Sequence, residues 1–344
     1  MKKKLMAVVL SALMAFGLAG CGSTGKAGSS AENPLTMKYS VTFSSSGTQA
    51  EGANRLGEII EEKSDKRLRF QFYPSAQLGD KVASMEGLRA GTIEMMELAA
   101  TDLSTFNDMW SVLSLPYLWD NDKQAVEVVT SGKAREYIDK EMESYGFKVI
   151  AWTSMGARSV LNDKHTVSTP EDLKGLKLRV MEDAILAEAT TKMGAIATPM
   201  ASSEIYTALQ QGTIDGLDHT PSVIASSGYT ELAKYFSLTE HFIIPDPVFV
   251  SLKWFNNLSE ENQKAVVEAG EAFTEEWNNE IWPKATEEGL QTMKDAGVEI
   301  TEVDKDLFRA KVQPMVDDFV KNGSEKQAEF YNLLMEGKAE HPVE

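Results

Sequence analysis

The chain has 344 residues, of which 42% are hydrophobic and 25% charged, as in globular proteins. Its 52 acidic and 34 basic residues give a formal net charge of −18 at pH 7. This balance argues strongly against nucleic-acid binding, which needs a basic surface, and weakens the case for docking of the folded domain on anionic lipid. The single cysteine, Cys21, excludes intrachain disulfides and thiolate metal clusters.

Residues 1–21 predict a bacterial lipoprotein signal peptide. Residues 2–4 are lysines, and residues 5–18 form an apolar run that is too short to be read as a membrane span. The tetrapeptide LAGC, which ends at Cys21, matches a lipobox, in which the cysteine is lipidated after cleavage. The alternative is an ordinary secretory signal with a chance cysteine. Residues 22–35 predict a flexible polar tether, so we expect a domain anchored by lipid outside the cytoplasmic membrane.

The next part of the chain alternates strand and helix patterns. Such alternation favours an α/β fold with a mostly parallel sheet and helices on both faces. Hydrophobic periodicity predicts strands at 37–43, 67–73, 92–99 and 147–152, and helices at 49–63, 79–90 and 123–145.

A second alternating set follows. It predicts strands at 159–161, 176–181, 196–199 and 214–217, with helices at 183–193 and 202–210. A further strand is predicted at 248–254, and this late strand can return to the first lobe. The final third is almost entirely helical in pattern. A helix from Ser259 to Ala296 would span roughly 55 Å and could brace two lobes. Pro283 lies inside this pattern, so two separate helices are the alternative.

No catalytic motif is convincing in this chain. Residues 20–27 fit the phosphate-binding pattern GxxxxGK, but Ala27 replaces the Ser or Thr that holds magnesium, and no strand precedes the segment. The four histidines lack metal-ligand spacing. A carboxylate site for a hard cation stays open. We therefore predict a non-enzymatic protein without a cofactor or a His/Cys metal site. The histidines are His165, His219, His241 and His341.

Arg179 stands out in the predicted strand 176–181. Leu176, Leu178 and Val180 occupy one face of that strand, and Arg179 points the other way near its carboxyl end, where open α/β sheets bind ligands. A positive charge kept there in so acidic a chain indicates a local use. A guanidinium suits a carboxylate because its planar fork matches the two oxygens and stays charged. A surface arginine in a loop is the alternative.

Four sequence blocks, in order and spacing, resemble the solute-binding subunits of TRAP (tripartite ATP-independent periplasmic) transporters, the DctP-like group. The resemblance covers about residues 36–320, and four ordered blocks are more specific than one motif. The blocks are FYPSAQLGD at 72–80, GLRAGTI at 87–93, PEDLKGLKLRV at 170–180 and GAIATPMASSEIYTALQQGTIDGLD at 194–218.

The resemblance implies a two-lobe, periplasmic-binding-protein-like α/β fold with a ligand cleft between the lobes and a long bracing C-terminal helix. Such proteins close on a small organic acid and deliver it to a two-component membrane permease. The expected division places residues 36–156 and 245–284 in lobe I, and residues 157–244 and 285–344 in lobe II.

The resemblance also implies roles for particular side chains. Arg179 corresponds to the family arginine that makes a bidentate bond to the ligand carboxylate. Arg158 corresponds to a second arginine that lines the cleft, with a hinge salt bridge as the alternative. His219 stands where the family usually has a ligand-facing asparagine, so the usual hydrogen bond is in doubt. Glu182 can accept bonds from sugar hydroxyls or face solvent.

Three positions depart from the sialate-binding branch of the family. Ala99 and Asp102 stand where that branch has a glutamate and an arginine, and Lys81 stands where it has an aspartate. These exchanges speak against sialic acid. A polar cleft suited to a hydroxylated acid, such as a hexuronate or an aldonate, would be formed by Gln49, Lys81, Glu182 and His219.

Other functions remain open from the sequence. A C4-dicarboxylate or another simple carboxylate would need two cationic anchors, with Arg158 joining Arg179 directly. An extracellular sensor lipoprotein could present the acid to a membrane histidine kinase with the same fold. A sugar-acid lyase or isomerase would need a base and acid constellation, which the motif search does not find.

Overall fold

The computed structural model describes residues 29–343. The predicted signal peptide, the lipidation site Cys21 and tether residues 22–28 lie outside the described residues. Leu35, which the sequence placed at the end of the tether, is the first residue of strand β1. Within residues 29–343, none of the helices combines the length and the apolar character that a bilayer crossing requires.

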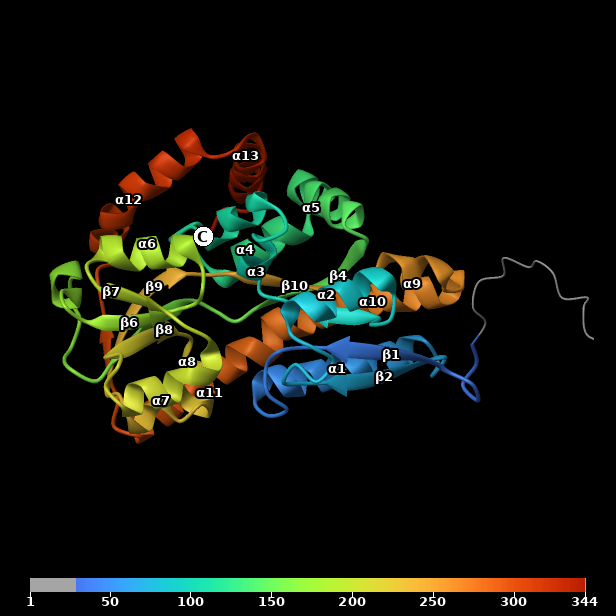
Figure 1. Cartoon of the computed structure of the whole chain (residues 1–344), viewed down its shortest axis with the longest axis horizontal. Coiled ribbons are helices and arrows are strands. Elements are labelled where there is room, and N and C mark those ends of the chain that lie inside the picture. Colours follow the sequence, from blue (N-terminus) through green and yellow to red (C-terminus); the bar gives the residue numbers. More distant parts are fainter. Residues whose placement is uncertain (1–28, 344) are drawn as a thin grey trace, which may run out of the picture.

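The strands form two sheets (Figure 1). The first sheet has the order β2-β1-β3-β10-β4, and the second has the order β11-β9-β5-β8-β6-β7. The first contains β1 Leu35–Ser40, β2 Leu68–Tyr73, β3 Met95–Glu97, β4 Phe147–Ser154 and β10 Pro245–Ser251. The second contains β5 Arg158–Asn162, β6 Lys177–Val180, β7 Ile196–Pro199, β8 Gly216–His219, β9 Tyr235–Phe242 and β11 Glu299–Glu302.

Helices cover both sheets. Those before β10 are α1 Thr48–Lys63, α2 Lys81–Ala90, α3 Ala100–Leu103, η1 Asp108–Ser114, α4 Asp122–Thr130, α5 Gly132–Ser144, η2 Pro170–Leu173, α6 Ala184–Met193, η3 Ser202–Glu204, α7 Ile205–Gln210, α8 Pro221–Ser226 and η4 Tyr229–Glu231. Those after it are α9 Leu252–Asn257, α10 Glu260–Glu276, the π-helical segment η5 Trp277–Ile281, α11 Trp282–Asp295, α12 Lys305–Asn322 and α13 Glu325–Glu340.

The two alternating sets of the sequence correspond to these two sheets, but several predictions were wrong in detail. The sheets are mixed rather than mostly parallel, because β10 runs antiparallel to β3 and β4, and β5 runs antiparallel to β8 and β9. The predicted helix 123–145 is two helices, α4 and α5, that separate where Gly132 adopts a φ of +58°. The predicted strand 248–254 ends at Ser251, whose hydroxyl accepts the Trp254 N–H and starts α9.

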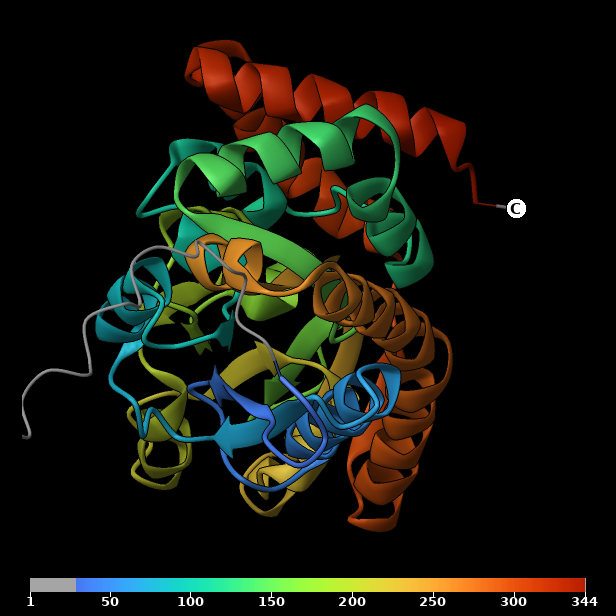
Figure 2. The same cartoon turned by 90° about the vertical axis from the view of Figure 1, so that its right-hand side faces the viewer.

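Two short connections and one long helix cross between the sheets. Residues 155–157 lead from β4 to β5, and residues 243–244 lead from β9 to β10. Strands β9 and β10 lie one after the other across the middle of the molecule in Figure 1. The late strand β10 returns to the first sheet and inserts between β3 and β4, as the sequence indicated. The third crossing is the helix α10–α11, which runs along one side of the molecule in Figure 2.

The helix is continuous through Pro283, so the prediction of one long brace was right. A π turn precedes the proline, with the Trp282 N–H bonded to the Trp277 carbonyl, and this wider turn accommodates a residue without an N–H. Two glycines allow the helix to touch both halves. A Cβ on Gly270 would lie 2.0 Å from the Ile150 carbonyl oxygen of β4, and a Cβ on Gly289 would lie 2.6 Å from the Ser222 nitrogen of α8.

Side chains of the helix also form hydrogen bonds with the backbone groups on the free edge of β4. The Trp152 N–H donates to Thr274 Oγ1 at 3.0 Å, and the Ser154 N–H donates to Asn278 Oδ1 at 2.9 Å. In return, Asn278 Nδ2 donates to the Trp152 carbonyl at 2.9 Å and Trp277 Nε1 donates to the Ser154 carbonyl at 2.8 Å. The helix therefore seals a strand edge that would otherwise expose unpaired backbone groups at the crossing point.

The C-terminal helices do not follow the expected division of the chain. Helix α12 packs on α6 and β9 of the second half, but α13 packs on η1, α4 and α5 of the first half. Phe330 of α13 is fully buried, with its ring 5.9 Å from the ring of Tyr137 and 6.0 Å from that of Trp110. The expectation that residues 285–344 all lie with the second lobe is therefore wrong for α13, which ties the two halves together at the top of Figure 2.

Candidate functional site

Arg179 lies in the interior of the second sheet, on β6, where it is opposite Thr198 of β7 and Leu217 of β8. Its side chain is 2% exposed. Nε and Nη2 donate to the Met200 carbonyl at 3.0 and 2.8 Å, and Nη2 also donates to Ser202 Oγ at 3.2 Å. The third nitrogen, Nη1, is buried and has no hydrogen-bond partner among the described residues.

No carboxylate within residues 29–343 forms an ion pair with Arg179. Burial lowers its pKa to about 10, and the nearby charge of Arg158 acts in the same direction. The guanidinium therefore stays charged at neutral pH, although no ion pair compensates its burial and Nη1 lacks a hydrogen bond. A buried cation with a free donor is costly on its own, and an anion placed at Nη1 would offset that cost.

Arg158 is held by Asp218, which the sequence did not single out. Arg158 Nε donates to Asp218 Oδ2 at 2.5 Å, and Nη2 donates to the Asp218 backbone carbonyl at 2.7 Å. Both side chains are almost fully buried, with 5% and 4% of their surface exposed. Burial raises the pKa of Asp218, but attraction to Arg158 and their hydrogen bond outweigh it and hold that pKa at about 2. The pair is therefore ionised at neutral pH.

His241 completes this cluster from the crossing strand β9. Its Nε2 lies 4.0 Å from Asp218 Oδ2, and its Nδ1 lies 2.8 Å from Thr239 Oγ1. The pairing of β9 with β5 is irregular here, and Glu240 has a φ of +45°, so a bulge turns this part of the strand. Burial lowers the pKa of His241 to about 4 in spite of the attraction of Asp218. The ring is therefore neutral at pH 7.

His219 lies at the end of β8, directly after Asp218, and is 9% exposed. Burial, followed by the charge of Arg158, lowers its pKa well below the usual value, so the ring is neutral. Its Nδ1 accepts the Thr220 N–H at 2.9 Å. A neutral ring that accepts at Nδ1 carries its proton at Nε2, which makes His219 a hydrogen-bond donor on that side.

Lys81 and Asp102 form an ion pair. Lys81 Nζ donates to Asp102 Oδ1 at 2.6 Å, and the two side chains are 46% and 26% exposed. These are two of the positions that depart from the sialate-binding branch, where the resemblance places an aspartate and an arginine. The charges at the two positions are thus the reverse of those in that branch, and no local pattern in the sequence indicates that the two residues pair.

Gln49 and Glu182 lie at the rim. Gln49 is half-buried in the first turn of α1, next to Thr48, whose hydroxyl is 3.3 Å from that of Ser222 at the start of α8. This contact joins the two halves three residues after His219. Glu182 is exposed, and its charge acts on Arg179. The structure therefore groups Arg179, Arg158, His219 and Glu182 on the second half, and Gln49 and Lys81 on the first.

The first half also contributes two acidic side chains that the sequence reasoning missed. Asp246, 4% exposed, is the second residue of β10, and Glu97 is the last residue of β3. Burial raises the pKa of both groups, and for Asp246 the charges of Glu97 and Asp102 add to the effect whereas that of Arg158 opposes it. In the sequence, Glu97 lies inside the predicted strand 92–99 and Asp246 lies just before the predicted strand 248–254, so neither position stands out.

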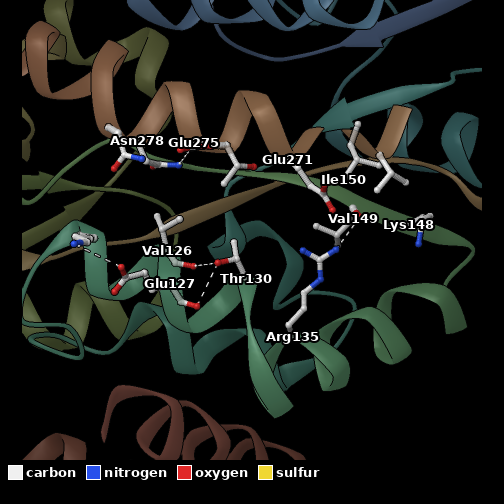
Figure 3. A pocket seen from close by; sticks show the side chains of 14 residues that line it. Val126, Glu127, Thr130, Arg135, Lys148, Val149, Ile150, Glu271, Glu275 and Asn278 are labelled. Atoms are coloured by element: carbon white, nitrogen blue, oxygen red, sulfur yellow. Dashed lines mark hydrogen bonds and ion pairs between the residues drawn. The ribbon is translucent and has the colours of Figure 1, made fainter. Parts of the chain in front are cut away.

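Two pockets of the described residues lie away from this group. One, about 540 Å³, lies between α4, α5, β4 and α10 (Figure 3). Its walls carry both charges, because its lining includes Arg135 and Lys148 as well as Glu271 and Glu275 of the long helix. The other, about 260 Å³, lies beside Leu35 and α9. Neither is lined by the residues grouped around Arg179.

Comparison with known proteins agrees with this architecture. Residues 39–322 match the model of a family described as bacterial extracellular solute-binding protein, family 7 (DctP). A solute-binding protein of Chromohalobacter salexigens is 34% identical over 270 residues, which is 78% of this chain and 80% of that one. The 2,3-diketo-L-gulonate-binding periplasmic protein YiaO of Escherichia coli is 29% identical over 289 residues, which is 83% and 88% of the two chains.

A solved structure gives the same result for the fold. The crystal structure of a TRAP periplasmic solute-binding protein from Chromohalobacter salexigens with bound D-glucuronate has a TM-score of 0.80 to this chain, with 31% identity, and covers 88% of this chain and 99% of that one. The resemblance that the four sequence blocks indicated is thereby confirmed, and the chain belongs to the family 7 bacterial extracellular solute-binding proteins, the DctP family.

Proposed function

We propose that this protein is the extracytoplasmic subunit of a TRAP transporter that captures a sugar acid, such as a hexuronate or an aldonate. The observation that carries the proposal is Arg179 Nη1, a buried and charged donor without a partner among the described residues. The relatives with bound D-glucuronate and with a 2,3-diketo-L-gulonate name support a sugar acid as the ligand class.

Arg179 would bind the carboxylate of the ligand. One carboxylate oxygen of the ligand would accept a hydrogen bond from Nη1. The other would accept one from Nη2 and replace Ser202 Oγ, whose bond of 3.2 Å is the longest that the guanidinium makes. Nε and Nη2 are held by the Met200 carbonyl, which fixes the orientation of the fork before the ligand arrives. The bidentate bond implied by the resemblance would therefore use the two terminal nitrogens.

Hydroxyl groups of the ligand would be bound by the neutral and paired side chains around this anchor. His219 would donate from Nε2, and Gln49 can both donate and accept. Lys81, held in place by its ion pair with Asp102, would donate a hydrogen bond to a ligand hydroxyl, and Glu182 would accept one. An affinity near micromolar corresponds to about −8 kcal/mol, which one charge-assisted pair and several hydrogen bonds can supply.

Arg158 would support the anchor rather than replace it. Because Nε and Nη2 of Arg158 are engaged by Asp218, it is poorly placed to bind a second carboxylate directly. A C4-dicarboxylate would need such a second anchor. The geometry thus favours a monocarboxylate with hydroxyl groups over the dicarboxylate alternative.

Delivery to a two-component membrane permease and anchoring through lipidated Cys21 complete the proposal. Members of this family act outside the cytoplasm. Anchoring is tested with Cys21→Ser in the full chain: the variant should leave the membrane fraction, and an unchanged membrane fraction would contradict lipidation at this residue.

The ligand class is tested by thermal shift with hexuronates, aldonates, keto acids and C4-dicarboxylates. A ligand that binds only the folded protein raises its melting temperature. We expect the largest rise with a hexuronate or an aldonate, confirmed by titration calorimetry. A larger rise with a dicarboxylate would reject the proposed ligand class.

A further inference from the structure

Asp122 lies at the place where the chain crosses between the two halves. It is the first residue of α4, and the hydroxyl of Ser154, at the end of β4, donates to its Oδ1 at 2.5 Å. The same hydroxyl accepts the Gly156 N–H at 3.3 Å, in the crossing segment 155–157. Because the Ser154 N–H and carbonyl are both bonded to the brace helix, Asp122 is connected through Ser154 to two of the crossings.

Trp282 of the brace helix brings an unused donor to the same place. The residue is 4% exposed, and its Nε1 is buried without a hydrogen-bond partner among the described residues. A Cβ on Gly156 would lie 3.1 Å from this nitrogen and 3.8 Å from Asp122 Oδ2. The indole donor and the second carboxyl oxygen therefore lie next to the same glycine, but no hydrogen bond joins them. A buried donor left in this way costs free energy.

The two groups belong to elements that meet at the junction of the halves. Asp122 begins α4, which packs on α5 and β4 of the first half. Trp282 begins α11, which packs on α8 of the second half. Gly156 has a φ of +83°, a conformation that glycine adopts without strain. A change in the angle between the halves therefore moves the Trp282 donor relative to the Asp122 carboxyl.

We propose that Trp282 and Asp122 form a latch for the open arrangement of the protein, in which Trp282 Nε1 donates to Asp122 Oδ2 once the halves have moved apart. In the described arrangement the halves are close, with Thr48 and Ser222 in contact, and the latch is released. The latch keeps part of the molecules open for ligand entry. This inference goes beyond the proposed function, because it does not depend on which acid is bound.

The gain comes from pairing two buried groups. Burial raises the pKa of Asp122, and the hydrogen bond from Ser154 opposes that shift, so a second donor would stabilise the charged carboxyl further. A hydrogen bond to such a group changes an equilibrium by roughly 10-fold. The structural alternative is that Trp282 only fills space beside Trp277, whose ring lies 5.2 Å away.

Spin-label distance measurements on the ligand-free full chain test the latch. Cys21→Ser removes the only native thiol, and labels at Glu58→Cys on α1 and Lys192→Cys on α6 report the separation of the halves. Trp282→Phe removes the donor and keeps an aromatic ring, so the ratio of open to closed molecules should fall by roughly 10-fold. Asp122→Ala should cause a similar fall, and the double variant should fall no further than either single variant.

Titration calorimetry with D-glucuronate, or with the tightest ligand of the thermal-shift panel, covers the case in which nearly all ligand-free molecules are open. The apparent Kd is inversely proportional to the fraction of molecules in the closed, binding-competent arrangement. The Kd of Trp282→Phe should then fall by the same factor. Tighter binding is the opposite of what the loss of a packing contact at the junction would produce, so this result separates the latch from a structural role.

Trp110→Phe is the matched control. Trp110 is fully buried between η1 and α13, which both lie on the first half, so its replacement should leave the ratio and the Kd unchanged. If Asp122→Ala does not fold, Trp282→Phe with this control decides the question. A folded Trp282→Phe variant with the wild-type ratio and Kd would overturn the latch, as would a ligand-free wild type that is entirely closed. Failure of every sugar acid to bind would reject the proposed function but leave the spin-label test of the latch in force.

Discussion

Arg158 and Asp218 are joined twice, once between their side chains at 2.5 Å and once from Arg158 Nη2 to the Asp218 backbone carbonyl at 2.7 Å. They come from neighbouring antiparallel strands, β5 and β8, on which Asp218 is opposite Val160. The pair therefore fixes the distance between two strands of the second sheet and keeps a positive charge next to Arg179. This relationship makes the pair both a structural element and an electrostatic support of the proposed anchor.

Arg158→Ala should lower the free energy of unfolding by about 3–5 kcal/mol, because it leaves the charge of Asp218 buried without its partner. Urea unfolding measures the change. Lys81→Ala, which breaks the more exposed pair with Asp102, should cost less than about 1 kcal/mol. Replacing both Arg158 and Asp218 by leucine should recover much of the loss, and a cost for Arg158→Ala no larger than that for Lys81→Ala would contradict the assignment.

His241 predicts a pH dependence of stability. Its pKa is about 4 in the folded protein and 6.5 as the ordinary value, so the unfolded chain binds the extra proton first as the pH falls. The stability contribution is complete above pH 6.5 and is lost progressively down to pH 4, by about 3 kcal/mol at most. His241→Gln should reduce the slope of unfolding free energy against pH in this window.

The control for this slope is His165→Gln, at an exposed loop position. It should retain the wild-type slope. Below pH 4 the depressed pKa of Asp218 adds a further loss of stability, so the comparison is made between pH 4 and pH 6.5. A slope in His241→Gln that equals the wild-type slope would show that the histidine is not buried in its neutral form.

Gly270→Ala should destabilise the protein although the position is helical. Alanine in place of glycine normally stabilises an exposed helix by about 1 kcal/mol. Here the new Cβ would lie 2.0 Å from the Ile150 carbonyl oxygen, so the brace must move off β4, at a cost of about 1–3 kcal/mol. The midpoint of urea unfolding reports the change, with Glu271→Ala at the exposed neighbouring position as the control. A Gly270→Ala variant that is more stable than the wild type would show that the helix and β4 do not approach each other as closely as described.

The contact of Thr48 with Ser222 predicts an effect on ligand release. The two hydroxyls are 3.3 Å apart and join α1 to α8. Their hydrogen bond can form only while the two halves are close. Ser222→Ala removes one hydrogen bond, so the dissociation rate of the ligand should rise roughly 2- to 10-fold in stopped-flow tryptophan fluorescence. Ser226→Ala on the same helix should leave the rate unchanged. Equal rates in both variants would indicate that the contact does not hold the closed state.

Much of the fold could be predicted because it follows from local patterns. The alternation of Leu176, Leu178 and Val180 places Arg179 on the other face of its strand, and the structure has that strand at Lys177–Val180. Local patterns predicted the long helix but left two separate helices around Pro283 as the alternative, because the π turn before the proline depends on Trp277 and its bond to the edge of β4.

The parts of the site that were missed share one physical cause, which is long-range contact. Lys81 and Asp102 are 21 residues apart, and Arg158 and Asp218 are 60 residues apart, so no helix or strand period connects the members of either pair. Asp246 lies just before the predicted strand 248–254, and its hydrogen bond to the first residue of α3 forms only because β10 returns to the first sheet. The strand pattern and the sequence blocks indicated Arg179 as the proposed anchor, whereas the residues around it could be found only from the tertiary structure.

The central claim is that Arg179 is the carboxylate anchor, and Arg179→Met tests it most directly by titration calorimetry with D-glucuronate, or with the tightest ligand of the thermal-shift panel. Methionine fills much of the volume of the arginine side chain but carries no charge that must be buried. The unliganded variant should therefore be at least as stable as the unliganded wild type. The affinity should fall by about 100-fold or more, because the ligand carboxylate would be buried without its donor. A folded Arg179→Met variant that binds the acid with wild-type affinity would contradict the account.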